Sequence, residues 1–520
     1  MIILNKNLKF YLIIFFLSNS LFFISIYQSL FIYDDFHWGL VFSNAIDFLD
    51  GKLPYKEIFI HYGFLTTFIH SIVIWLSNYK MISLMIFTSL IYYLSIIQFF
   101  FLVKKIFKIE MATIIIFFLY LIHPFPNYPW HNYIVFFLFI TSLNLQLINR
   151  NLTNFIAGIM LALCVLTSEV FIVFLLIILL FEYFLINKNK SRFFIKIIGI
   201  TIILITFINA LITKNLFNDW IGHLKISRVI LQNANLIDVI LFFFINFLKL
   251  SITNIFTEPY RIISISSIFF SFLIIINFIK NNKKLEIKDE IFLLINISSI
   301  FFYYTMLHQD NLFRFATGPI IGIISIFYYI EKIKNTNVKK NILIILFLIA
   351  LFSYPFEKRD NNNKNYVRKN VIEDHISSNE FSFFKYQIWS PEVWKNLINF
   401  KNYLNENKCK DNYYFVNLSF NGFYYIIAKE LGYKTFQKIP WYEDTKYGNS
   451  LYNNFDEKFF LTLEKNLNDK KVILTAEENF KKVIKYNKKI YYMDDYNYIK
   501  LSYNGRGSSN TILFFPKSCE

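Results

Sequence analysis

The chain has 520 residues, of which 55% are hydrophobic, and its formal net charge is +17. A soluble domain of this length could not keep so much apolar surface away from water, so the composition excludes an ordinary globular protein. The lysines and arginines are spread over short loops and the C-terminal region rather than gathered on one basic face. Nucleic-acid binding is therefore not expected.

Apolar stretches recur along the chain up to residue 355, and most are long enough to cross a bilayer core of roughly 30 Å. The first, residues 8–32, is too long for a signal-peptide core, so we expect it to remain as an uncleaved span. We predict an α-helical polytopic membrane bundle of about eleven transmembrane helices over residues 1–356. The expected spans are 8–32, 81–103, 111–125, 132–148, 154–168, 170–186, 193–213, 261–279, 291–307, 315–330 and 341–355.

Loop charges orient these spans, because Lys and Arg prefer the cytoplasmic side. Lys6 and Lys9 place the N-terminus in the cytoplasm, and the acid-rich first loop, residues 33–60, then lies outside. Two further apolar stretches, 61–78 and 239–256, would each reverse the later loops if they crossed the membrane. We therefore expect both to be interfacial helices on the outer side, which keeps the lysine-rich loops after them in the cytoplasm.

Residues 357–520 alternate short apolar strands with polar turns, which is typical of a soluble α/β domain. We expect buried strands at 413–418 and 471–475, and a helix at 423–431 that ends at Gly432. Strands at 498–503 and 511–515 flank an Asn-Gly-Arg-Gly turn, a hairpin signal. The last span places this domain on the extracytoplasmic face of the membrane, expected to be a bacterial inner or plasma membrane.

With this topology, ionisable residues at the membrane borders gather on the outer side. Many have an ordinary explanation: acidic residues suit outer loops, as we assume for Asp47 and Asp50, and Arg or His near a helix end often reaches the lipid headgroups. Glu169 is less easily explained, because a carboxylate between two apolar stretches is costly without a partner. The candidates are Asp34, Asp35, Glu57, His61, Glu169, His223, Lys225, Arg228, Arg261, His308, Asp310 and Arg314.

Carboxylates and cations together at the outer membrane border suit the transfer of a sugar from a lipid phosphate at the membrane surface. Such a reaction needs a carboxylate base at that height to take a proton from the acceptor hydroxyl. It also needs cations that hold the phosphate leaving group as its negative charge develops, and Arg is always charged and bidentate. A transporter would more often place ionisable residues near the midplane on broken helices, where this sequence offers few candidates.

The first outer loop carries Tyr-Asp-Asp-Phe-His-Trp at 33–38, Gly-Lys-Leu-Pro-Tyr at 51–55 and Phe-Ile-His-Tyr-Gly at 59–63. This order resembles the first outer loop of the GT-C superfamily of integral membrane glycosyltransferases, which includes protein O-mannosyltransferases and the aminoarabinose transferases of lipid A. Residues 161–169 are similar to a mid-chain segment of that family, but they end in Thr-Ser-Glu where the family usually has Thr-Lys. The loop 308–314 resembles the family's substrate-facing loop near the last spans.

The resemblance implies an inverting glycosyltransferase, with Asp34 as the catalytic base and Asp35 as its acidic neighbour. The donor would be a polyprenyl-phosphate sugar, and the acceptor a glycan, a lipid or a protein. The family includes metal-independent members and members that need a divalent cation. Because Asp34 and Asp35 alone do not form a metal site, we expect no cofactor. The expected substrate-binding residues are Glu57, His61, Glu169, Lys225, Arg228, Arg261, His308, Asp310 and Arg314.

Two other functions stay open. A flippase or transporter for lipid-linked glycans would be a membrane protein without catalysis, and donor turnover by the purified protein would separate it from an enzyme. A polymerase of lipid-linked oligosaccharides would be an enzyme that uses a diphosphate carrier. Assays with monophosphate and diphosphate donors would distinguish this last case.

The loop charges predict that Lys104, Lys283 and Lys339 face the cytoplasm, while Asp35, His308 and the C-terminal domain face outside. Single cysteines at these positions, in a chain whose own three cysteines are replaced, should react accordingly with a membrane-impermeant maleimide on intact cells. Labelling of position 283 from outside would overturn the interfacial assignment of residues 239–256.

Overall fold

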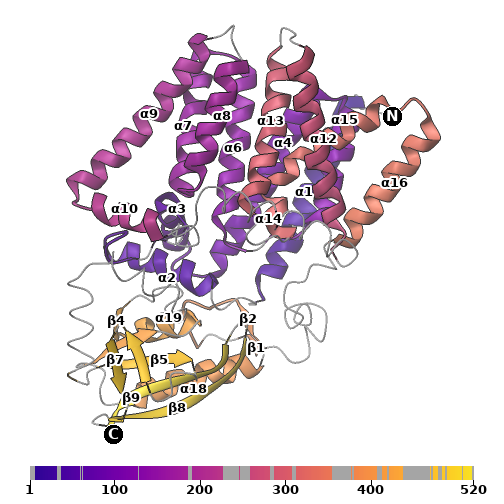
Figure 1. Ribbon diagram of the computed structural model, residues 1–520. Helices are drawn as coiled ribbons and strands as arrows, with labels where there is room; N and C mark the ends of the chain where they lie inside the picture. Colours follow the sequence, from indigo (N-terminus) through magenta and orange to yellow (C-terminus); the bar gives the residue numbers. More distant parts are fainter. Residues whose placement is uncertain are drawn as a thin grey trace. The chain divides into compact units, whose positions relative to one another are not determined.

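The computed structural model contains a helical membrane region and a C-terminal region with β-sheet (Figure 1). It describes residues 6–31, 37–58, 60, 62–126, 128–185, 190–226, 245, 258–281, 286–306, 312–353, 376–377, 380–389, 391–406, 413–417, 421–436, 469, 472–477, 483–486, 489–492, 494–505 and 508–517. The chain divides into two compact units. The first comprises Met1–Ile26, Phe87–Phe207 and Ala234–Arg359, and the second comprises Tyr27–Ile86, Ile208–Asn233 and Asp360–Glu520. The predicted domain boundary after residue 356 lies outside the described residues.

The first unit is a bundle of helices that follow the predicted apolar stretches. The helices are α1 (Lys6–Ser29), α4 (Ile82–Ile106), α5 (Ile109–Ile122), α6 (His131–Ile148), α7 (Asn151–Thr167), α8 (Phe171–Leu185), α9 (Lys190–Thr213), α12 (Tyr260–Asn281), α13 (Ile287–Met306), α14 (Leu312–Ala316), α15 (Ile323–Lys332) and α16 (Thr336–Ser353). By length and composition, six of the described helices can cross a membrane: α1, α4, α6, α9, α12 and α16. This confirms the predicted helical membrane fold, while the count of about eleven spans stays a prediction.

Helices α1 and α4 run antiparallel. Near the beginning of α1, the Tyr11 hydroxyl accepts a hydrogen bond of 2.8 Å from Lys104 Nζ, near the end of α4. At the other end of the pair, Ser25 and Ser89 share a hydrogen bond of 2.7 Å between their hydroxyls. The beginning of α1 and the end of α4 therefore lie on the same side of the bundle, as the interfacial assignment of residues 61–78 requires.

The stretch 315–330, predicted as one span, is broken in the structure. Helix α14 ends at Ala316, a 3-10 turn η3 (Pro319–Gly322) follows, and α15 begins at Ile323. Pro319 has no N–H for a helical hydrogen bond, and it disfavours helical geometry at Gly318 before it. Ser299 donates a hydrogen bond of 2.6 Å to the Pro319 carbonyl, so a neighbouring helix satisfies part of the interrupted backbone.

A buried ion pair ties three helices of the bundle together. Lys196 of α9 contacts the carboxylate of Glu182 on α8, and its Nζ also donates a hydrogen bond of 3.0 Å to Gln146 Oε1 on α6. Lys196 is 4% exposed and Glu182 is 1% exposed. Next to this pair α7 approaches α9 closely, because a Cβ added at Gly158 would lie 2.1 Å from the Lys196 carbonyl oxygen. Small residues at such crossings are typical of membrane helices.

The second unit joins the first outer loop to the C-terminal region. It contains α2 (His37–Leu49), α3 (Phe64–Leu76) and α10 (Phe217–Ile226) together with the C-terminal elements. Helix α3 has 13 residues, so at 1.5 Å per residue it is about 20 Å long and shorter than a bilayer core of roughly 30 Å. This length favours the interfacial assignment of α3. The second interfacial stretch, 239–256, lies almost entirely outside the described residues.

The C-terminal region contains the predicted α/β domain. Its elements are β1 (Ile376–Ser377), β2 (Ile388–Trp389), α18 (Pro391–Glu406), β3 (Tyr414–Asn417), α19 (Phe423–Glu430), β4 (Lys434–Phe436), β5 (Val472–Glu477), β6 (Val483–Tyr486), β7 (Lys489–Tyr492), β8 (Tyr496–Gly505) and β9 (Ser508–Pro516).

The main sheet of this domain has the strand order β4-β3-β5-β9-β8, with β3 parallel to β4 and β5, and β9 antiparallel to β5 and β8. Helix α18 packs on the sheet through Phe400, whose ring centroid lies 5.6 Å from that of Phe415. The predicted hairpin is confirmed, and so is the predicted helix that ends at Gly432 (φ 84°).

Candidate active site

The predicted catalytic pair, Asp34 and Asp35, lies between α1 and α2 in the sequence. Helix α1 ends at Ser29 and α2 begins at His37, and residues 32–36 are outside the described residues. The role of both carboxylates therefore stays a prediction. The structure does describe α2, which begins two residues after Asp35 in the sequence.

Helix α2 is anchored to the C-terminal domain by the carboxylate of Asp47, which is fully buried. Asp47 Oδ1 accepts a hydrogen bond of 3.0 Å from Lys52 Nζ and also pairs with Lys429 of α19. Asp47 Oδ2 accepts a hydrogen bond of 2.7 Å from the Tyr425 hydroxyl. Burial and the Asp47 charge raise the pKa of Tyr425 well above its ordinary value, so the hydroxyl stays protonated and continues to donate.

Two glycines allow α2 to approach the beginning of α19 closely. A Cβ added at Gly39 would lie 2.6 Å from the Gly422 Cα, so no larger residue fits at either position without a shift of the backbone. The Phe42 ring of α2 also contacts the Phe383 ring at a centroid distance of 5.7 Å. Together with the Asp47 pairs, these contacts hold the first outer loop and the C-terminal domain as one packed unit.

Glu57, a predicted substrate-binding residue, has a local structural contact. Its exposed carboxylate accepts a hydrogen bond of 2.7 Å from the Leu53 backbone N–H. This contact stabilises the turn after α2. It uses only one of the two carboxylate oxygens, Oε2. Nearby His61, also a predicted site residue, lies outside the described residues.

Arg314, a predicted substrate-binding residue of the loop 308–314, lies in α14 of the first unit. Its guanidinium carbon is 4.5 Å from the ring centroid of Trp130, a cation–π arrangement that orients the side chain. Trp130 is buried and directly precedes α6. The Phe315 ring, one residue further, lies 6.0 Å from the Tyr260 ring at the beginning of α12. The structure therefore brings Arg314 and Arg261 to neighbouring helix ends.

Arg261 is already paired in this structure. Its Nε donates a hydrogen bond of 2.5 Å to Glu258 Oε2, and the arginine is only 2% exposed. The Glu258 carboxylate balances the guanidinium charge, so Arg261 is a weaker candidate for a lipid phosphate than the sequence indicated. It is better explained as a residue that fixes the beginning of α12.

The other predicted residues are described only in part. Glu169 lies half-buried in the turn between α7 and α8, where it makes contacts within the fold. Helix α10 contains positions 223 and 225 in its backbone, but the side chains of His223 and Lys225 are not described. Three further predicted residues lie outside the described ranges: Arg228, His308 and Asp310.

No group of three His, Cys, Asp or Glu side chains in the described ranges could hold a metal ion. Asp34, Asp35, His61 and His308 do not belong to those ranges. The expectation that the site works without a metal therefore stays a prediction.

Sequence reasoning missed two residues that shape these sites. Asp47 was assigned to ordinary loop acidity, although an acidic residue inside the mostly apolar stretch His37–Leu49 was a signal of a buried partner. Glu258 was not considered, although it stands three residues before Arg261, the spacing of a helical ion pair.

Comparison with known proteins gives a structural match. No family model and no curated protein sequence matches the chain. The archaeal oligosaccharyltransferase AglB from Archaeoglobus fulgidus, in complex with an inhibitory peptide and a dolichol-phosphate, is similar over 92% of this chain and 70% of that chain, with a TM-score of 0.51 and 11% identity. Two other structures of the A. fulgidus oligosaccharyltransferase, with zinc and sulfate and in the apo form, each give a TM-score of 0.49 at 12% identity. They cover 91% and 92% of this chain, and 68% and 70% of their own.

The match with AglB concerns the fold, because 11% identity says nothing reliable about individual residues. The resemblance predicted from the first outer loop agrees with this similarity to a membrane oligosaccharyltransferase, which is a similarity of fold. The chain thus has the fold of a polytopic helical membrane protein, similar to that of AglB, with a C-terminal α/β region.

The Asp47 anchor gives a stability prediction. Asp47→Asn keeps the shape but removes the charge that balances Lys52 and Lys429, so we expect the free energy of unfolding to fall by about 1–3 kcal/mol. Asp50→Asn is the matched control: Asp50 also pairs with Lys429, at 2.5 Å, but its side chain is 46% exposed, and such pairs contribute at most about 1 kcal/mol. Thermal unfolding of the purified full chain, with limited proteolysis of the C-terminal domain, measures both. Equal effects of the two substitutions would contradict the anchoring role.

Proposed function

We propose that this chain is a membrane glycosyltransferase that takes sugar from a lipid-linked donor. The observation that carries the proposal is the similarity of its fold to AglB over 92% of the chain, in a structure that contains a dolichol-phosphate and an inhibitory peptide. One fold can host several chemistries, so the argument for the reaction must also come from the residues. The acidic first loop and Arg314 provide that argument.

The donor in this proposal is a polyprenyl-phosphate sugar. A lipid phosphate places its scissile bond at the membrane surface, and Arg314 is a permanent cation on the short helix between two apolar stretches. The guanidinium keeps its charge while it stacks on Trp130, so it is already oriented before a phosphate binds. Such preorganised charge stabilises the phosphate leaving group as the bond to the sugar breaks.

The transfer is proposed to be inverting. Asp34 takes the proton of the acceptor hydroxyl, and the acceptor oxygen attacks the anomeric carbon from the face opposite the phosphate. The bond between the anomeric carbon and the phosphate oxygen breaks, and its electron pair leaves with the lipid phosphate. The acceptor is a glycan, a lipid or a protein hydroxyl, and the reaction is proposed to need no metal.

The remaining residues are proposed to bind substrate rather than to react. They are Asp35 beside the base, and Glu57, His61, Glu169, Lys225, Arg228, His308 and Asp310. Arg261 keeps only a positioning role in this proposal, because Glu258 already occupies its guanidinium. On the predicted topology the reaction takes place on the extracytoplasmic face.

A flippase for lipid-linked glycans and a polymerase with a diphosphate carrier are the competing functions. Sugar release from a polyprenyl monophosphate donor by the purified protein would exclude the first. Preference for a monophosphate over a diphosphate donor would exclude the second. Binding of both lipids without turnover would favour the flippase.

Asp34→Asn should lower turnover by a factor on the order of 10²–10⁴, because the amide keeps the size of the side chain but cannot accept the proton. Donor binding should be retained. Asp35→Asn is the matched control on the adjacent residue and should lower turnover by a smaller factor. The loss of turnover in Asp35→Asn with near-normal activity in Asp34→Asn would exchange the two roles, and activity in both variants would remove the proposed base.

Arg314→Ala should weaken donor use by about 1–3 kcal/mol in kcat/KM terms, the scale for losing a hydrogen bond to a charged group. Arg314→Lys keeps the charge but loses the planar fork and the stacking on Trp130, so we expect an intermediate loss. Steady-state kinetics with a polyprenyl-phosphate sugar measure both variants. Unchanged kinetics in a well-folded Arg314→Ala protein would remove this residue from the donor site.

A further inference from the structure

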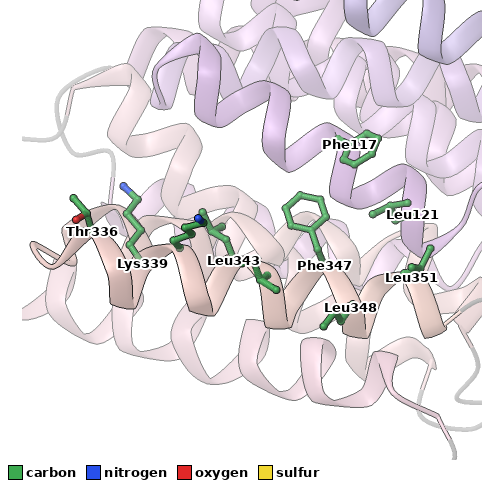
Figure 2. Close-up of a pocket in the computed structure, with 10 residues that line it drawn as sticks. Phe117, Leu121, Thr336, Lys339, Leu343, Phe347, Leu348 and Leu351 are labelled. Carbon is green, nitrogen blue, oxygen red and sulfur yellow. The ribbon is translucent and has the colours of Figure 1, made fainter.

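A largely apolar groove lies between α5 and α16 in the first unit, with a volume of about 660 Å³ (Figure 2). Phe117 and Leu121 line it from α5, and Leu343, Phe347 and Leu351 are among the residues that line it from α16. The ring centroids of Phe117 and Phe347 are 5.7 Å apart, so the two helices meet at this level. The groove therefore has an apolar floor along most of its length.

One end of the groove is positively charged. Thr336, Lys339 and Lys340 line it there, in the first two turns of α16, and Figure 2 shows Thr336 and Lys339 at the end opposite Leu351. Within the described part of the chain, the ion pairs involve neither lysine. Two adjacent cations beside an apolar groove are complementary to a lipid with an anionic headgroup.

The lysine charges, rather than the end of the helix itself, are what this site offers to an anion. Asn335 Oδ1 already accepts the backbone N–H groups of Asn337 and Val338, at 3.0 and 3.2 Å. Lys339 is half-buried, whereas Lys340 and Thr336 are exposed. The two ammonium groups and the Thr336 hydroxyl are thus the polar groups available at this end.

The dimensions of the groove match one leaflet of a bilayer. From Lys340 to Leu351 the helix rises about 16 Å at 1.5 Å per residue, close to half of a hydrocarbon core of roughly 30 Å. Ile344 and Leu348 are each 48% exposed, so the groove is open along its side to a lipid chain. On the predicted topology the lysines face the cytoplasm, where anionic lipids attract basic residues.

We propose that this groove binds an anionic glycerophospholipid, with its phosphate held by Lys339 and Lys340 and one acyl chain lying along α16 from Leu343 to Leu351. The lipid would be a bound constituent of the protein and not the sugar donor, because the predicted topology places the donor chemistry at the opposite membrane border. The proposal stands independently of the proposed glycosyl transfer.

Native mass spectrometry of the purified full chain tests this, with phosphatidylglycerol or phosphatidylcholine added at equal concentration. We expect the chain to retain phosphatidylglycerol preferentially, and Lys339→Gln/Lys340→Gln to lower its occupancy by a factor on the order of ten. Lys105→Gln/Lys280→Gln removes the same charge from exposed lysines outside the groove and should leave occupancy unchanged. Ile344→Trp keeps the lysines but fills the groove, so it should also lower occupancy.

Three results would overturn the proposal. Equal retention of the two lipids by the unaltered chain would show no headgroup recognition. An equal loss of phosphatidylglycerol occupancy in the two double-lysine variants would show that the lipid is attracted by general surface charge. Displacement of phosphatidylglycerol by a much lower concentration of a polyprenyl monophosphate would make the groove a donor site instead.

Discussion

The buried carboxylate of Asp47 determines how the first outer loop is held. Burying a carboxylate costs several kcal/mol unless charge and hydrogen bonds compensate, and here Lys52, Lys429 and the Tyr425 hydroxyl supply both. Because Lys429 and Tyr425 belong to α19, docking of α2 on the C-terminal domain brings the carboxylate to two of its three partners. Asp35 stands two residues before α2 begins. In the proposed chemistry, the C-terminal domain therefore fixes the helix that follows the proposed base in the sequence.

The two arginines at the helix ends of the first unit differ in a way that charge alone does not reveal. Arg261 and Glu258 are both nearly buried and form a pair whose disruption would leave an unbalanced charge, so this pair contributes to the beginning of α12. Arg314 lies against the aromatic face of Trp130, which orients its guanidinium. Its side chain is half-buried, whereas Arg261 is almost fully buried, and this distinguishes the two arginines.

The sequence predicted the bundle well, because membrane helices are specified by local apolar length: residues 132–148 were expected as a span and α6 occupies His131–Ile148. The strands expected at 413–418 and 471–475 and the hairpin were equally local, whereas β1, β2, β4, β6 and β7 were not predicted. The break at Gly318 and Pro319 was overlooked because the apolar character of 315–330 is continuous across it, although the two residues themselves are a breaker signal. The Asp47 anchor could not be derived, since Tyr425 is 378 residues further along the chain and no local pattern connects them. The catalytic pair was proposed from a motif alone, and its geometry is not described.

The charges inside the bundle bear on the choice between an enzyme and a transporter. Lys196, Glu182 and Gln146 connect three helices through a buried ion pair and a hydrogen bond. The adjacent crossing of α7 and α9 is tight at both Gly158 and Gly199, where an added Cβ would lie 2.1 and 2.4 Å from backbone oxygens of the facing helix. Alternating access requires helices to move against one another around a polar site. A crossing without room for a methyl group, beside a buried ion pair, disfavours sliding of α7 against α9 at this point of the bundle.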